Sequence, residues 1–113
     1  MKEPAWRLLD YADVLDIAAR IIATRDWVPR VPLGRREYCA WSALDDATIG
    51  VDIGLDTKEI AAHLAHHLGF ERDGNSDSNA PIPRWNDRQK IRWPIIAAMK
   101  RTAAELRAQA EKR

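Results

Sequence analysis

The chain has 113 residues, of which 46% are hydrophobic and 31% charged, and its net charge is +1. This length suits one domain, and the composition excludes a wholly disordered or fibrous chain. No apolar run reaches the roughly 20 residues that cross a bilayer, no early segment resembles a secretory signal, and a single cysteine, Cys39, indicates a reducing compartment. We therefore expect one globular domain in the cytoplasm, without membrane contact.

The charges are unevenly distributed along the chain. Residues 1–83 hold nine Lys/Arg and fourteen Asp/Glu, a net charge of −5, whereas residues 84–113 hold nine and three, a net charge of +6. A basic segment of this kind can follow phosphates, or it can be the solvated face of a helix packed on an acidic body. The sequence leaves both interpretations open.

A first helix is predicted over about residues 11–25, after an N-terminal arm formed by residues 1–9. Asp10 or Asp13 can cap its start, because a carboxylate accepts the unpaired N–H groups of the first turn. The apolar residues that recur at helical spacing are Val14, Ile17, Ala18, Ile21 and Ile22. Prolines soon after Trp27 then predict a loop.

A second helix is predicted over about residues 36–47. Tyr38, Cys39, Trp41 and Leu44 make it apolar on more than one face, as is typical of a central, buried helix. Residues 48–56 follow, and their apolar residues alternate with glycine or aspartate after Thr48. This period of two indicates an extended connector that contains at most one short strand.

A third helix is predicted to begin after Asp56. Asp56 and Glu59 form an acidic version of the capping box, in which each side chain accepts a backbone N–H at the other end of the first turn. Ile60, Leu64 and other apolar residues form its buried stripe, and Gly69 is expected to end it.

The last third of the chain contains a loop and a final helix. Residues 71–83 are expected to form a flexible loop, with extended backbone where prolines recur at its end. Trp93 and Pro94 then begin a helix, because proline suits the first helical turn. Residues 108–113 are expected to be a frayed tail.

These elements predict a mainly α fold, a compact single-domain bundle of about four helices with long loops and room for one short strand. Most of the core is expected between the first, second and last helices. The residues expected at its centre are Ile17, Ile21, Cys39, Leu44, Ile96 and Met99.

Three short motifs resemble those of a family of small uncharacterised proteins, a domain of unknown function common in actinobacteria and their phages. They are VLDIAARIIATRDW at 14–27, YCAWSAL at 38–44 and Trp-Asn-Asp at 85–87. The resemblance covers nearly the whole chain and supports the fold. It implies no activity, cofactor or catalytic residue, so function has to be argued from the residues themselves.

The three histidines lie together, and two of them offer a candidate metal site. Glu59, His63 and His67 are spaced four residues apart, which places them on one face of the third helix. Two imidazoles at this spacing can share a metal ion, and the carboxylate can add an oxygen. The favoured alternative is that both histidines flank the apolar stripe half-exposed, and we expect no cofactor.

Five tryptophans exceed what a small helical core requires, so some are candidates for a surface that binds a partner. We single out Trp6, Trp85 and Trp93, together with the neighbouring cations Arg88 and Arg92. Trp6 can dock on its own chain or on another one. Trp85, with the asparagine and aspartate that follow it, is better explained as an anchor that fixes a loop.

The sequence contains no nucleophile elbow, phosphate loop or other catalytic motif, and Cys39 is expected to act as a small apolar residue. The favoured hypothesis is therefore a small non-catalytic interaction or regulatory protein, such as an accessory protein of phages or actinobacteria, with a protein partner. The alternative is a nucleic-acid-binding module that uses the basic segment 84–107. A metal-binding protein or enzyme is the third hypothesis, and a homo-oligomer is compatible with all three.

Overall fold

Five α-helices form the regular structure of the described residues in the computed structural model. The structure describes residues 3–25, 27, 39–51, 54–69 and 81–113, apart from the side chains of residues 81, 83, 84 and 87. The helices are α1 (Ala5–Thr24), α2 (Ala40–Val51), α3 (Thr57–His67), α4 (Pro81–Arg88) and α5 (Trp93–Glu111). The expected all-α bundle is confirmed, and the described part of the chain contains no strand.

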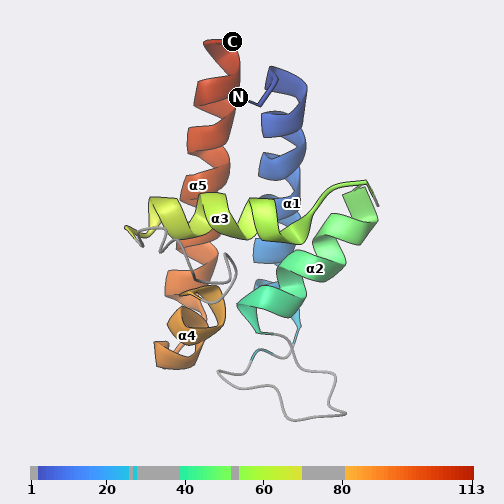
Figure 1. The fold of residues 1–113 in the computed structure, drawn as a ribbon. Helices are drawn as coiled ribbons and strands as arrows, with labels where there is room; N and C mark the ends of the chain where they lie inside the picture. Colours follow the sequence, from blue (N-terminus) through green and yellow to red (C-terminus); the bar gives the residue numbers. More distant parts are fainter. Residues whose placement is uncertain (1–2, 26, 28–38, 52–53, 70–80) are drawn as a thin grey trace.

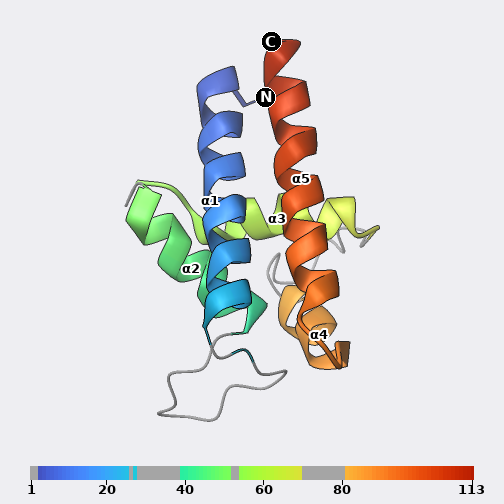
Figure 2. The same cartoon turned by 180° about the vertical axis from the view of Figure 1, so that it is seen from behind.

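The two longest helices, α1 and α5, form an antiparallel pair that is the centre of the molecule (Figures 1 and 2). Helix α3 crosses one face of this pair, and α2 packs beside the C-terminal half of α1 (Figure 1). Helix α4 lies at the end of the pair where α5 begins. The ends of the chain therefore lie together at the opposite end of the molecule (Figure 1).

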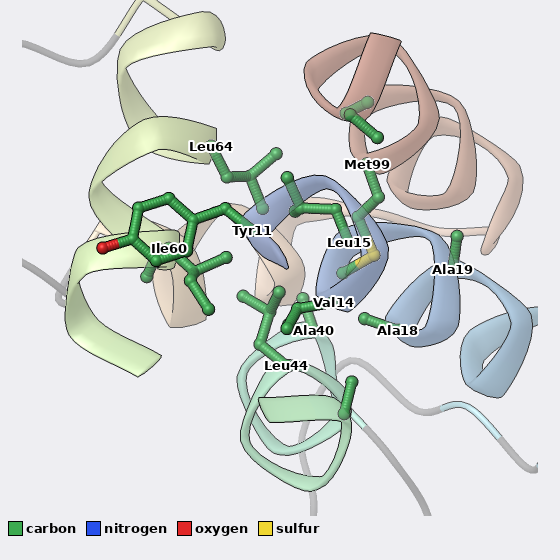
Figure 3. Packing of buried hydrophobic residues seen from close by; sticks show 14 of the residues in the cluster. Tyr11, Val14, Leu15, Ala18, Ala19, Ala40, Leu44, Ile60, Leu64 and Met99 are labelled. Atoms are coloured by element: carbon green, nitrogen blue, oxygen red, sulfur yellow. The ribbon is translucent and has the colours of Figure 1, made fainter. Parts of the chain in front are cut away.

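The core is formed where α1 meets the other helices. Leu8, Leu15 and Ile22 of α1 are fully buried and lie seven residues apart, so they share one face of that helix. Figure 3 shows Leu15 between Leu64 of α3 and Met99 of α5. Burying a side chain of this size stabilises the fold by about 1.5–3 kcal/mol, so each of these three residues contributes substantially to stability.

Six residues were expected at the centre of the core, and the structure confirms three of them. Leu44, Ile96 and Met99 are buried. Ile17 and Ile21 are only half-buried, because the buried face of α1 is rotated toward their neighbours. Cys39 is also half-buried, since it precedes α2 instead of lying inside it.

The first helix begins six residues earlier than expected. Its N-cap is Pro4, whose carbonyl accepts the N–H groups of Arg7 and Leu8, at 3.0 and 3.2 Å. Residues 5–9 therefore belong to α1 and not to an arm, and neither Asp10 nor Asp13 is the cap. Burial of Leu8 explains this result, because it extends the helical face that packs on α5.

The prediction of a short strand within residues 48–56 was wrong for the residues of this segment that the structure describes. Helix α2 continues to Val51, so Ile49 and Gly50 are helical despite the alternating pattern. Thr48 is buried, and its hydroxyl donates a hydrogen bond of 2.6 Å to the Leu44 carbonyl within the helix. Residues 36–38 and 52–53 lie outside the described residues.

The third helix begins and ends where the sequence indicated. The Asp56 carboxylate accepts the Lys58 N–H at 2.9 Å, and Gly69 adopts a left-handed φ of 84° after the last turn. Asp56 is therefore the N-cap as predicted, but the reciprocal bonds of the capping box are not seen: the Glu59 N–H donates to the Asp56 main-chain carbonyl, and the Glu59 carboxylate accepts a hydrogen bond from the Tyr11 hydroxyl.

The end of the predicted loop 71–83 is helical. Residues 71–80 lie outside the described residues, but α4 begins at Pro81, so the extended backbone expected there was wrong. Ile82, Trp85 and Asn86 are buried on one face of this short helix, which supplies the packing that the proline pattern does not reveal. Helix α5 begins at Trp93 as predicted, and it extends through the expected tail to Glu111.

Candidate functional site

A hollow of about 250 Å³ lies between the start of α1 and the start of α3. The residues that line it are Trp6, Arg7, Tyr11, Gly54, Leu55, Asp56 and Glu59. Trp6 is 56% exposed, and the Arg7 guanidinium carbon lies 5.1 Å from the centroid of its ring. This cation–π contact stabilises the orientation of the indole by about 0.5–1 kcal/mol at an exposed position.

Tyr11 forms the inner wall of the hollow. Its side chain crosses from α1 to α3 beside Ile60 and Leu64 (Figure 3), and its hydroxyl donates to Glu59. Burial raises the pKa of Tyr11, and the hydrogen bond and negative charge of Glu59 raise it further. The Tyr11 hydroxyl is therefore held in its neutral form, as a hydrogen-bond donor to Glu59.

The proposed metal-binding residues lie on α3 as expected, but each has a different partner. Nε2 of His63 lies 3.2 Å from a Glu3 carboxylate oxygen, and Nδ1 of His67 lies 2.7 Å from one of Glu105. Glu59 is bonded to Tyr11. Among the described residues, no group of three His, Cys, Asp or Glu side chains is placed to hold a metal ion.

Cys39 has a capping role at the start of α2. Its N–H donates to Ser42 Oγ at 3.0 Å, and its Sγ lies 3.4 Å from the same oxygen. His63 and His67 bond instead with Glu3 and Glu105, and the hydrogen bonds described for the Cys39 thiol include no imidazole.

The second group of exposed apolar side chains lies where α4 meets α5. Ile91 is 59% and Trp93 66% exposed, and Arg88 and Lys90 are also exposed. Arg92 points the other way: its Nη1 donates to the carbonyls of Ile22, Ala23 and Arg25, at 3.0, 3.2 and 3.0 Å. Because these carbonyls end α1, Arg92 is a C-terminal cap contributed by another helix.

The Trp-Asn-Asp motif has a structural role that was only partly foreseen. Trp85 is buried, and the fully buried Asn86 accepts hydrogen bonds at Oδ1 from the Trp27 indole N–H and the Ala40 N–H, both at 2.9 Å. Asn86 thus caps α2 from a distant part of the chain and not through a local turn. The side chain of Asp87 lies outside the described residues.

The basic segment is paired with the acidic body at one position. Arg107 Nη2 lies 3.1 Å from an Asp13 oxygen and 2.7 Å from an Asp16 oxygen. This contact joins α5 to α1, which is one of the two interpretations that the charge pattern left open. Such partly exposed pairs contribute little to stability, commonly about 0.2–1 kcal/mol.

The fold and these contacts define a small all-α single-domain protein whose two exposed tryptophans, Trp6 and Trp93, lie on different helices. The chain belongs to a family of unknown function, DUF6197, which matches residues 7–106. Comparisons with curated proteins and with solved structures gave no match. In the described ranges, no helix has both the length and the apolar character needed to cross a membrane.

Proposed function

We propose that this protein is a small non-catalytic interaction protein and that it binds a protein partner at the hollow beside Trp6. The observation that carries the proposal is the exposed indole on the rim of a formed hollow. Tryptophan buries about 150–250 Å² when it is covered and is enriched among residues that dominate binding energy. Its cation–π contact with Arg7 preorganises the ring, which lowers the entropy lost on binding.

The polar groups around the hollow favour binding over chemistry. Tyr11 donates to Glu59, and His63 pairs with Glu3, so each group is engaged by another side chain of the same protein. General acid–base or nucleophilic catalysis needs a base aimed at a reactive group and a site for substrate between them. The cluster instead fixes α1 against α3 and thereby shapes the hollow.

The lining also defines the chemistry of the partner. Asp56 and Glu59 each use one carboxylate oxygen in a described hydrogen bond, and no described residue engages their second oxygens. With Arg7 included, the lining has a net charge of −1. We infer that a partner segment places a lysine or arginine side chain against these carboxylates and an apolar side chain against Trp6 and Leu55.

A displayed library of random linear peptides tests this proposal, because selection from it does not require the partner to be identified. Peptides are selected on the parent protein and depleted on Trp6→Ala, and affinities of the survivors are measured by titration. We expect enriched peptides to combine a cation with a neighbouring apolar residue. Trp6→Ala should weaken their binding by roughly 30-fold, equivalent to about 2 kcal/mol.

Two further variants sharpen the test. Glu59→Gln should weaken binding of the cation-containing peptides, whereas Trp93→Ala, which removes the other exposed tryptophan, should not. The proposal is wrong if no peptide survives depletion, or if the survivors bind Trp6→Ala as tightly as they bind the parent protein. Survivors that lack a cation would refute the inferred partner chemistry.

We also propose that the protein acts in the cytoplasm as an accessory or regulatory protein of actinobacteria or their phages. The three sequence motifs and the single half-buried cysteine support this setting. A fluorescent fusion expressed in an actinobacterium should remain diffuse in the cytoplasm, and accumulation at the envelope would contradict the proposal.

A further inference from the structure

A run of positive charge at the α4–α5 junction forms a second candidate binding surface, which is separate from the hollow. Residues 88–104 contain five cations and no Asp or Glu. The structure turns Arg92 inward and leaves the other four exposed. We call the basic face the surface formed by Arg88, Lys90, Trp93, Lys100 and Arg101.

Trp93 lies between these cations in the sequence and is the most exposed of the large hydrophobic residues described, at 66%. Lys100 follows it by seven residues, close to two helical turns, so both lie on one face about 10.5 Å apart along the axis. No described ring or cation lies against the Trp93 indole. The basic face thus presents a flat aromatic side chain with positive charges on both sides of it in sequence.

The position of Trp93 is fixed by the residue before it. Arg92 holds the start of α5 against the end of α1 through three backbone carbonyls. Pro94 at the first turn further restricts the backbone. A ligand stacking on Trp93 would therefore meet a surface that is already ordered.

The nearest described acids on α1 and α5 have other partners. Asp13 and Asp16 are bound by Arg107, and Glu105 pairs with His67. None of the four exposed cations of the basic face forms an ion pair with a described acid. No described acid therefore cancels the positive potential of this face by direct contact.

We propose that the basic face binds single-stranded nucleic acid, with phosphates at the four cations and a base stacked on Trp93. Stacking on an exposed aromatic side chain needs an unpaired base, which a duplex does not offer. An acidic peptide would satisfy the cations but would make less use of the flat indole. The expected binding is weak and independent of sequence, because cations and one stacking ring do not read base edges.

Fluorescence anisotropy of labelled 12-nucleotide oligo(dT) and oligo(U), measured over a series of salt concentrations, tests the proposal. We expect micromolar binding at low salt, with a log–log salt slope near −0.7 for each phosphate contact and hence near −3 for four. A duplex of equal length and a 12-residue polyglutamate peptide serve as competitors. Both should compete more weakly than the unlabelled single strand.

The variants separate the electrostatic contribution from stacking. Arg88→Ala combined with Lys90→Ala should reduce the magnitude of the salt slope by about 1.4. Trp93→Ala should weaken binding roughly 10-fold and leave the slope unchanged, because stacking releases no counterions. The matched control, Lys58→Ala with Lys112→Ala, removes two exposed cations elsewhere and should bind like the parent protein.

Each contrary result refutes a defined part of the proposal. Absence of binding at low salt, or equal weakening by the control pair, would exclude the basic face as the site. Unchanged affinity in Trp93→Ala, or equal competition by the duplex, would exclude stacking of an unpaired base. Stronger competition by polyglutamate would assign the face to an acidic protein. None of these results bears on the Trp6 hollow, whose test uses peptides.

Discussion

Replacing Asn86 by alanine should destabilise the protein by about 3 kcal/mol, because Asn86 joins α4 to Trp27 and to the start of α2. Its Oδ1 accepts two hydrogen bonds, from the Ala40 N–H and the Trp27 indole N–H, and its side chain is fully buried. The substitution leaves both donors without this acceptor. It also removes the tertiary cap of α2, since Ala40 is the first residue of that helix.

The magnitude follows from the exposure of each donor. A buried donor left unsatisfied costs about 1–3 kcal/mol, and Ala40 is fully buried. Trp27 is only half-buried, so its indole N–H can bond to water at a cost of about 0.5–1 kcal/mol. The small cavity left by the carboxamide adds about 1 kcal/mol. The sum is a large fraction of the roughly 5–15 kcal/mol that stabilises a typical domain.

Urea denaturation followed by far-ultraviolet circular dichroism measures this effect. The transition midpoint should fall while the dependence of the free energy on urea stays the same. Gln89→Ala is the matched control, because Gln89 donates one hydrogen bond, to the Trp85 carbonyl, from a half-buried position. It should cost less than about 1 kcal/mol. A loss below about 1 kcal/mol in Asn86→Ala would refute the capping role.

Two further predictions concern the contacts of α1. Arg92→Ala should lower the free energy of unfolding by about 1–2 kcal/mol in the same urea assay, because three carbonyls at the end of α1 lose a charged donor. Arg92→Lys should recover part of the lost stability. Equal stability of Arg92→Ala and the parent protein would contradict this role. Burial and Glu59 raise the pKa of Tyr11 in the folded state, whereas an unfolded tyrosine ionises near pH 10. The stability contributed by neutral Tyr11 is therefore complete below about pH 10 and is lost as the pH rises further. Tyr11→Phe should show a smaller loss over that range, and parallel pH profiles of the two proteins would refute this explanation.

The sequence alone determined the elements whose signals are local. Asp56 and Gly69 define α3 because a side-chain cap and a left-handed glycine act within one helical turn. Proline after Trp93 identified the start of α5 for the same reason. The uneven charge left open whether the basic segment pairs with the acidic body, and the structure shows such a pair at Arg107, whereas four other described cations of this segment stay exposed.

The errors arose where tertiary packing outweighs local preference. The apolar residues after Thr48 alternate with glycine or aspartate, a pattern typical of a strand. Helix α2 nevertheless continues to Val51, and within it the buried Thr48 bonds to the Leu44 carbonyl. Prolines at 81 and 83 suggested extended backbone, yet burial of Ile82 and Trp85 stabilises a short helix there. Both prolines lie in the first turn of α4, where a helix has no partner for the N–H that proline lacks, so burial of one large side chain outweighs the remaining preference for extended backbone.

The candidate surfaces depended on the tertiary structure even where the sequence named their residues. Trp6, Trp85 and Trp93 were all named as candidates, with Trp85 favoured as a structural anchor, and the fold buries Trp85 and exposes the other two. Arg88 and Arg92 were likewise named together as candidate binding residues, but the Arg92 side chain bonds to the end of α1. Helical periodicity defines which residues share a face of one helix. What covers that face depends on how α1, α3 and α5 meet, and this is set by contacts between residues distant in the chain.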